Sequence, residues 1–131
     1  MKNQLDRRLF LGAAGAGLVV LPGRSGRAAA SERVRVAVIG LRNRGTDLVR
    51  LFAANPGSQV AAVCDVDDMM FVKPIEAMQK ITNMAPPTEK DFRRLLDDKT
   101  IDAVAIATPD HWHAMLTVLA CQAGFEMPSH V

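Results

Sequence analysis

A glycine-bracketed turn that directly follows an apolar run constrains this chain more than any other stretch. Residues 33–45 read RVRVAVIGLRNRG, in which a β-branched run predicts a buried strand and Gly40 ends it. Apolar residues at helical spacing follow Gly45. The unpaired amides and the dipole of a helix N-terminus favour a negative group. The sequence therefore predicts a phosphate-binding turn between a strand and a helix.

The first thirty residues have the pattern of an export leader. Arg7 and Arg8 precede a short apolar stretch at residues 9–21, and alanines at 28–30 offer a cleavage site. The stretch DRRLFLGAAGAG resembles a twin-arginine signal. The apolar stretch is shorter than the roughly 20 residues that span a bilayer, and its glycines weaken a soluble helix. We therefore expect residues 1–30 to be removed on export to the periplasm, leaving no stable membrane anchor.

The charge of the chain changes once that leader is set aside. The whole sequence carries 16 Lys and Arg against 14 Asp and Glu. Residues 1–30 hold five of these basic residues and one acid, which leaves 11 basic and 13 acidic residues in the remainder. A mildly acidic body without a basic stripe or interleaved aromatic residues argues against a nucleic-acid surface.

The remainder of the chain alternates apolar strands with helices. Apolar runs at residues 60–64 and 101–107 predict two further buried strands. Thr88 and Asp91 resemble a capping box for a short helix, and Gly124 is expected to end the last helix. The predicted helices cover residues 47–55, 74–81, 92–96 and 110–123. Strands that are apolar throughout predict an α/β fold with a doubly wound parallel sheet covered on both faces.

The three predicted strands end at residues that suit a dinucleotide. Ligands of doubly wound sheets lie beyond the carboxyl ends of the strands, where the winding direction reverses. Those ends are Gly40, Asp65 and Thr108. Asp65 lies 20 residues after Gly45, at a position where a carboxylate accepts hydrogen bonds from the adenosine ribose. This carboxylate would also repel a 2′-phosphate, so NAD is favoured over NADP. A solvated acidic loop is the alternative, because two more aspartates follow.

The turn departs from the usual G-x-G-x-x-G pattern. Arg42 stands where the middle glycine normally lets the backbone approach a pyrophosphate. We expect Asn43 to compensate, because asparagine tolerates a left-handed backbone better than other non-glycine residues. Arg42 or Arg44 is expected to add a charge-assisted bond to phosphate. On this motif alone, a plain tight turn with surface arginines is the alternative.

The stretch after the third strand is the most distinctive. Residues 107–113 read ATPDHWH. Together with RVAVIGLRNRG, VAAVCDVD and LLDDKTIDAVAIATPDHWH, they resemble the N-terminal nucleotide domain of the Gfo/Idh/MocA oxidoreductases, over most of residues 33–124. The resemblance implies a Rossmann fold and an NAD-dependent oxidoreductase that acts on a sugar, polyol or related carbohydrate.

The same resemblance implies roles for the last motif. Thr108 and Pro109 would line the nicotinamide ribose and the pyrophosphate, while Asp110, Trp112 and His113 would approach the nicotinamide. A core-packing role for Trp112 stays open. Histidines two residues apart point to different sides of a helix, so no metal site is expected here. The candidate cofactor-binding residues are Gly40, Leu41, Arg42, Asn43, Arg44, Gly45, Asp65, Thr108, Pro109, Asp110, Trp112 and His113.

The resemblance stops near the end of the chain. In the family a strand and a Glu-Lys-Pro turn follow the last helix, the lysine is thought to act as acid and base, and a substrate domain comes next. Residues 125–131 instead read FEMPSHV, an atypical tail that is either a remnant of that turn or unrelated sequence. Met127 has no ionisable group, so no catalytic residue is assigned. We expect an incomplete Rossmann domain at residues 31–124 that lacks the C-terminal substrate domain.

Three further expectations follow. The strand at residues 101–107 would have an unpaired apolar edge, which favours association into a homo-oligomer. Cys64 and Cys121 are expected to be separate buried thiols.

Two functions stay open from the residues alone. One is the dinucleotide-binding part of an exported oxidoreductase, and the other is a stand-alone nucleotide-binding or non-functional remnant.

Overall fold

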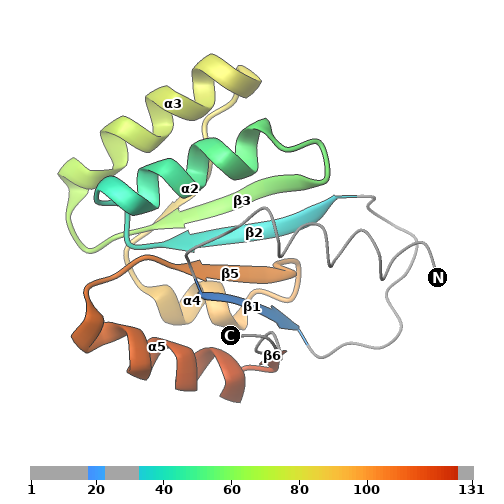
Figure 1. Ribbon diagram of the computed structural model, residues 1–131, viewed down its shortest axis with the longest axis vertical. Helices are drawn as coiled ribbons and strands as arrows, with labels where there is room; N and C mark the ends of the chain where they lie inside the picture. Colours follow the sequence, from blue (N-terminus) through green and yellow to red (C-terminus); the bar gives the residue numbers. More distant parts are fainter. Residues whose placement is uncertain (1–17, 23–32, 127–131) are drawn as a thin grey trace.

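In the computed structural model, which describes residues 18–22 and 33–126, a sheet lies between two layers of helices (Figure 1). The strands are β1 (Leu18–Pro22), β2 (Val34–Ile39), β3 (Ser58–Cys64), β4 (Thr88–Glu89), β5 (Ala103–Ile106) and β6 (Phe125–Glu126). The helices are α2 (Asn43–Ala54), α3 (Val72–Thr82), α4 (Phe92–Asp97) and α5 (Asp110–Gln122), and a 3-10 turn, η1 (Asp68–Phe71), leads into α3.

The sheet has the strand order β4-β3-β2-β5-β1-β6. The first four strands in this order are parallel, whereas β1 is antiparallel to β5 and to β6. The chain runs outward from β2 through β3 to β4 and then returns to β5 on the other side of β2. The winding direction therefore reverses between β2 and β5. The predicted doubly wound parallel α/β sheet is confirmed.

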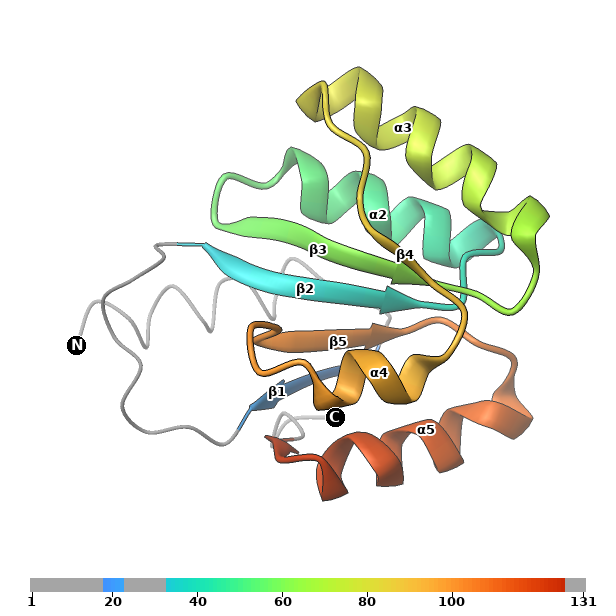
Figure 2. The same cartoon turned by 180° about the vertical axis from the view of Figure 1, so that it is seen from behind.

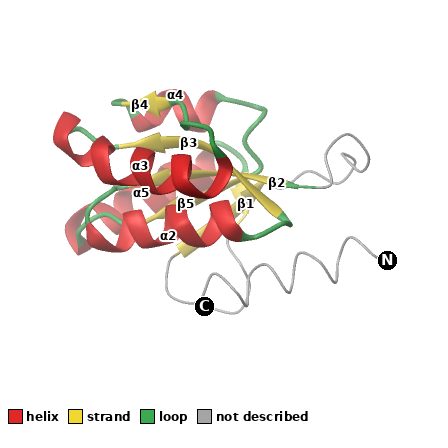
Figure 3. Ribbon diagram, turned by 90° about the horizontal axis from the view of Figure 1, so that it is seen from above, coloured by secondary structure: helices red, strands yellow, loops and turns green. Residues whose placement is uncertain are grey.

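Alternate side chains of each parallel strand feed two separate cores. Val36 and Val38 of β2 pack with residues of α2 and α3, whereas Ala37 and Ile39 pack with residues of α4 and α5. Figures 2 and 3 show α2 and α4 on opposite sides of the sheet. All four of these β2 residues are at most 4% exposed. Burial on both faces explains why the strand is apolar throughout.

Several element boundaries differ from the predicted ones. Helix α2 begins at Asn43, four residues earlier than expected, because the turn after β2 takes only three residues. The predicted capping box is wrong. Asp91 is itself the N-cap of α4, where its side chain accepts a hydrogen bond from the amide of Arg93, and Thr88 lies in β4. Gly124 follows α5 with a left-handed φ of +98°, so its predicted place after that helix is confirmed.

The two cysteines lie in different environments. Cys64 is buried at the end of β3, as predicted. Cys121 is exposed, so its predicted burial is wrong. The side of α5 that packs on the sheet is formed by Leu116 and Ala120, and Cys121 is one residue beyond it.

The predicted free edge of the third strand is also wrong. Strand β1 pairs with β5 along that edge, with Leu18 opposite Ile106 and Val20 opposite Val104. β1 belongs to the segment expected to be a leader, whose other residues, at 1–17 and 23–30, lie outside the described part of the chain. Met127 also lies outside it. In the described part, no helix is long and apolar enough to cross a membrane.

Candidate functional site

Gly40 forms the turn at the carboxyl end of β2. Its φ of +86° is one that side chains rarely tolerate. A Cβ atom on Gly40 would lie 2.9 Å from the carbonyl oxygen of Ala107 and 2.9 Å from the amide nitrogen of Thr108. The Gly40 amide donates a hydrogen bond to the Cys64 carbonyl oxygen at 2.8 Å. Glycine at this position therefore lets the ends of β2, β3 and β5 meet.

Gly45 brings the first turn of α2 against this loop. A Cβ atom on Gly45 would lie 1.8 Å from the carbonyl oxygen of Gly40. The hydroxyl of Thr46 closes the loop by donating to the Leu41 carbonyl oxygen at 2.7 Å, and the Leu41 side chain is buried in the core. Thr46 is not among the site residues predicted from the sequence, although a hydroxyl at a helix start often bonds to nearby backbone.

The start of α2 leaves its first amides without a side-chain cap. Arg42 is extended, with φ −62° and ψ 175°, and Asn43 opens the helix. The first amides of a helix have no partner within the helix, so an anion can accept hydrogen bonds from them. The predicted left-handed conformation of Asn43 is wrong, because among the described residues only Asn83 and two glycines have a positive φ. The side chains of Arg42, Asn43 and Arg44 are exposed beside these amides.

Asp65 is tied directly to the turn. Its Oδ2 accepts a hydrogen bond from the Leu41 amide at 2.8 Å, and its Oδ1 accepts one from the Asp67 amide at 3.1 Å. The side chain is half-buried at the carboxyl end of β3. A carboxylate has about four acceptor sites, so two backbone bonds leave it able to accept hydroxyl groups. The loop and the acid predicted to act together are therefore in contact.

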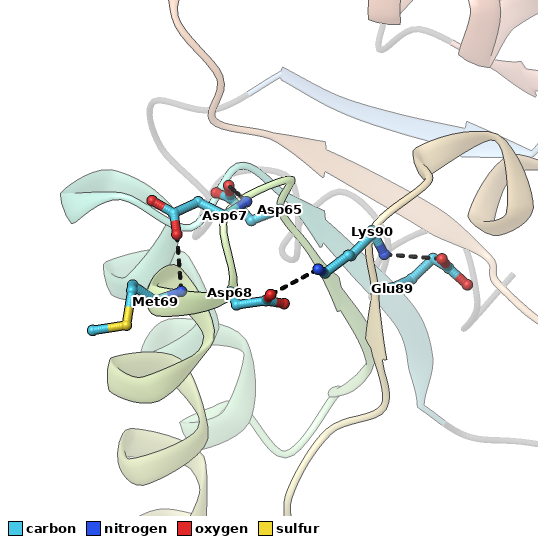
Figure 4. Close-up of polar contacts among 6 residues, drawn as sticks. All are labelled: Asp65, Asp67, Asp68, Met69, Glu89 and Lys90. Carbon is cyan, nitrogen blue, oxygen red and sulfur yellow. Dashed lines mark hydrogen bonds and ion pairs between the residues drawn. The ribbon is translucent and has the colours of Figure 1, made fainter.

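The neighbouring acids have different partners (Figure 4). Asp67 accepts a hydrogen bond from the Met69 amide at 2.9 Å and so caps η1. Asp68 forms an ion pair with the Nζ of Lys90 at 2.7 Å, which joins this loop to the loop after β4. Of the three aspartates, Asp65 is the one that contacts the glycine turn. The cluster is therefore more than a solvated acidic loop.

Thr108 contributes an unpaired hydroxyl at the end of β5. Its Oγ1 is buried and has no hydrogen-bond partner among the described residues. A buried polar atom without a partner costs roughly 1–3 kcal/mol. The next residue, Pro109, precedes α5 without a side-chain cap, and Asp110 begins the helix. A polar ligand that reached Oγ1 would remove this cost, which fits a dinucleotide at this end of the sheet.

The remaining candidates lie on the first turn of α5. The Nδ1 atom of His113 lies 3.1 Å from the Thr108 carbonyl oxygen, so the ring links the first turn of α5 to the loop that follows β5. Trp112 is 47% exposed and lies beside His111, with 6.0 Å between the ring centroids. A core-packing role for Trp112 is therefore wrong. The approach of Trp112 and Asp110 to a nicotinamide stays a prediction.

Cys64 lies beside the site, but its thiol is unreactive. Burial, and then the nearby carboxylates of Glu89, Asp65 and Asp91, raises the pKa of its thiol to about 12. The thiol therefore stays protonated at neutral pH and cannot act as a nucleophile there. In the described residues, no group of three or more His, Cys, Asp or Glu side chains is arranged to hold a metal ion.

Comparison with known proteins gives relatives for most of the chain. The glycosyl hydrolase family 109 protein of Stenotrophomonas maltophilia is 35% identical over 73% of this chain and 22% of its own length. That of Streptomyces filamentosus is 39% identical over 77% of this chain and 22% of its own length. The chain thus spans about a fifth of the length of these curated relatives.

A solved structure shares the fold. The scyllo-inositol dehydrogenase of Lactobacillus casei, solved with bound NAD(H) and scyllo-inositol, superposes with a TM-score of 0.56 at 22% identity. The match covers 70% of this chain and 26% of that chain. The family model described as the oxidoreductase family with an NAD-binding Rossmann fold matches residues 34–131. These residues include the turn, Asp65 and Thr108, and the chain therefore belongs to the Gfo/Idh/MocA oxidoreductase family.

Proposed function

We propose that the chain binds NAD in preference to NADP and is the cofactor-binding part of an oxidoreductase that acts on a sugar, polyol or related carbohydrate. One observation carries the proposal. The Asp65 carboxylate meets the Leu41 amide at 2.8 Å, immediately beside the left-handed Gly40 and the uncapped start of α2. A phosphate-binding turn and an acid suited to a ribose are thereby joined at the point where the sheet winding reverses.

The preference for NAD rests on the charge of Asp65. The ribose of NAD offers hydroxyl groups, which a carboxylate accepts, whereas NADP carries a 2′-phosphate, which a carboxylate repels. The ion pair of Lys90 with Asp68 supports this preference, because it engages a nearby cation that would otherwise be available to a phosphate. Arg42 and Arg44 are exposed close to the turn. Their positive charges act against the preference for NAD, because they would attract a 2′-phosphate.

The residues of this chain bind and orient the cofactor. When bound, the dinucleotide supplies a hydride acceptor or donor. The amides at the start of α2 would hold its phosphates, Asp65 the adenosine ribose, and the Thr108 hydroxyl a polar group toward the nicotinamide end. We assign no proton transfer to any described residue.

The substrate class comes from the relatives. The similar proteins are glycosyl hydrolase family 109 proteins and a scyllo-inositol dehydrogenase, and glycosides and inositols are both polyhydroxylated compounds. The chain spans about a fifth of the length of these curated relatives. We therefore expect the residues that would select a substrate to lie in the remaining part of the relatives' length.

Nucleotide titration tests the cofactor proposal. The purified chain is titrated with NADH and with NADPH, and energy transfer from Trp112, the one tryptophan in the chain, to the nicotinamide is followed alongside calorimetry. We expect NADH to bind more tightly than NADPH by about tenfold or more, because hydrogen bonds to a charged group contribute about 1.5–3 kcal/mol. Asp65→Asn should remove most of this difference while keeping an acceptor for the Leu41 amide.

Asp67→Asn is the matched control, because Asp67 lies in the same loop and bonds within it. It should leave the NADH to NADPH ratio unchanged. Equal binding of both nucleotides by the unaltered chain would overturn the NAD preference. Binding of neither nucleotide would overturn the cofactor proposal and favour a non-functional remnant.

We further propose that the protein is exported by the twin-arginine route to the periplasm. The support is the pattern of Arg7, Arg8 and the apolar stretch at residues 9–21. The double variant Arg7→Lys, Arg8→Lys keeps the charge and should abolish appearance of the protein in the periplasmic fraction. Unchanged fractionation of this variant would contradict the proposed route.

A further inference from the structure

The ring of His113 makes a hydrogen bond whose direction follows from its partner. Its Nδ1 atom lies 3.1 Å from the Thr108 carbonyl oxygen. A carbonyl oxygen can only accept a hydrogen bond, so Nδ1 carries the proton and donates it. When the ring is neutral, Nε2 is then the unprotonated nitrogen. The contact therefore selects one of the two neutral forms of the ring.

The peptide unit before Thr108 is fixed by β2 and by the glycine turn. The Ala107 amide donates to the Ile39 carbonyl oxygen at 2.8 Å. A Cβ atom on Gly40 would lie 2.9 Å from the Ala107 carbonyl oxygen and 2.9 Å from the Thr108 amide nitrogen. On the side of α5, the Thr108 carbonyl oxygen is held by His113. The Thr108 backbone therefore lies between the glycine turn and the histidine ring.

The loop that carries Thr108 leads directly into α5 (Figure 2). Pro109 follows Thr108, and its carbonyl oxygen accepts a hydrogen bond from the Trp112 amide at 3.0 Å. His113 lies in the first turn of the helix, and its own carbonyl oxygen accepts a hydrogen bond from the Thr117 hydroxyl at 2.7 Å. The helix therefore holds the His113 backbone while the ring reaches back to the end of β5.

The Thr108 hydroxyl depends on this backbone for its orientation. Its Oγ1 atom is buried and forms no hydrogen bond to any residue that the structure describes. Because threonine is β-branched, its side chain has few accessible rotamers. The backbone of Thr108 therefore determines where the hydroxyl points, and a group that fixes this backbone also directs the hydroxyl.

We propose that His113 is a positioning residue for the cofactor. By donating from Nδ1 to the Thr108 carbonyl oxygen, it sets the direction in which the Thr108 hydroxyl meets the bound dinucleotide. Since Nδ1 is engaged by the backbone, the ring acts through Thr108 and needs no contact with the nicotinamide. This inference rests on the proposed binding of NAD at this end of the sheet.

Two substitutions separate the hydrogen bond from the bulk of the ring. His113→Asn keeps a donor, because its amide nitrogen, like Nδ1, is bonded to Cγ, whereas His113→Leu has none. NADH dissociation constants are measured by titration, and stability by urea denaturation. We expect NADH to bind about five- to tenfold more weakly to His113→Leu, as for the loss of one hydrogen bond, and within about twofold of the unaltered chain to His113→Asn. Normal NADH affinity in a folded His113→Leu variant would overturn the proposal.

A double-mutant cycle shows whether His113 acts through Thr108. His113→Leu and Thr108→Val are made separately and together, and NADH affinity is measured for each variant. Once the Thr108 hydroxyl has been removed, loss of the histidine should weaken binding by no more than about twofold further. Losses that multiply in the double variant would overturn the proposal, because the ring would then contribute independently of the hydroxyl.

The protonation of the ring is checked without any substitution, which covers a variant that fails to fold. Nitrogen NMR of the unaltered chain at alkaline pH, where the ring is neutral, should show a protonated Nδ1 and an unprotonated Nε2. The opposite assignment would overturn the positioning role, even in a chain that binds NADH. Failure of the unaltered chain to bind NADH would instead overturn the proposed function, and this inference with it, whatever the state of the ring.

Discussion

The two ends of the central strand β2 differ in whether nearby polar groups have hydrogen-bond partners. At the amino end, the Arg35 amide donates to Asp102 Oδ2 at 2.9 Å, the Asp102 amide donates to the Arg35 carbonyl oxygen at 2.9 Å, and Arg35 Nε donates to the Thr100 carbonyl oxygen at 3.0 Å. At the carboxyl end, within the described part of the chain, α2 starts without a side-chain cap and Thr108 Oγ1 is buried without a hydrogen-bond partner.

This difference separates stability from binding within one sheet. Polar groups that satisfy one another hold the chain together and leave nothing for a ligand. Buried polar groups without partners lower the stability of the protein when no ligand is bound. A ligand that forms hydrogen bonds with them removes this free-energy cost. We therefore expect changes at the amino end to alter the free energy of unfolding, and changes at the carboxyl end to alter nucleotide affinity.

Gly45→Ala should lower both the stability of the protein and its affinity for nucleotide, and we expect it to have the greatest effect of the changes considered. Gly45→Ala places a Cβ atom 1.8 Å from the Gly40 carbonyl oxygen, a backbone atom that cannot move cheaply. We expect a loss of more than about 4 kcal/mol in the free energy of unfolding, the range of exceptional substitutions. Urea denaturation measures this loss, and NADH titration should show no binding at protein concentrations where the unaltered chain binds.

Gly57→Ala is the control for Gly45→Ala. Gly57 lies in the turn before β3, and a Cβ atom there would meet only the Asn55 Oδ1 atom at 3.3 Å. The change should cost less than about 1 kcal/mol, as is usual for surface positions. Equal losses for the two variants would contradict the close packing of α2 on the turn.

At the amino end, Asp102→Ala should affect stability alone. The change removes the acceptor for the Arg35 amide and should lower the free energy of unfolding by about 1.5–3 kcal/mol, typical of a hydrogen bond to a charged group. The dissociation constant of NADH, measured where the variant is folded, should be unchanged. Weaker NADH binding by this folded variant would show that the two ends are coupled.

At the carboxyl end, Thr108→Val should have the opposite outcome. Valine has the shape of threonine and removes the buried hydroxyl, which has no hydrogen-bond partner in residues 18–22 and 33–126. We expect the free energy of unfolding to stay the same or rise by about 1 kcal/mol, while NADH binds about five- to tenfold more weakly through the loss of one hydrogen bond. Thr108→Ser, which keeps the hydroxyl, should bind NADH nearly as the unaltered chain does. A Thr108→Val variant that is less stable but binds normally would assign the hydroxyl to the fold.

The smallest effect concerns pH and again belongs to the amino end. Hydrogen bonds from the Thr100 amide and then the Thr100 hydroxyl hold the pKa of Asp98 below its ordinary value. The carboxylate therefore contributes stability that is present above about pH 3.9, the unfolded value, and is lost as the pH falls through the lower folded pKa. The gain is small because Asp98 is exposed and screened.

Urea midpoints between pH 2 and 6 check this expectation. The difference between the unaltered chain and Asp98→Asn should be constant above pH 5 and should shrink below pH 4. A difference that grew with falling pH would mean that the sign of the shift is wrong.

Much of the site could be predicted because its residue types follow from position along the chain. A glycine after a β-branched run, an aspartate after the second strand and a threonine after the third all lie at strand ends, and parallel strands end at the same edge of a sheet. The capping of α4 by Asp91 rather than Thr88 could not be predicted, because two-residue β4 gives no periodic signal and takes Thr88 into the sheet.

The sequence alone predicts the order of the three strands β2, β3 and β5 and of the four α-helices, the two-sided burial of the sheet and the place of the glycine turn, because hydrophobic period and glycine conformation are local properties. Which atoms come into contact depends on the tertiary packing. The Asp65 carboxylate accepts a hydrogen bond from the Leu41 amide 24 residues away, and the Thr108 hydroxyl has no hydrogen-bond partner among the residues that the structure describes. Only pairing between distant segments placed β1 on the edge of β5. Such contacts depend on how strands pack across the sheet, which no stretch of sequence specifies alone.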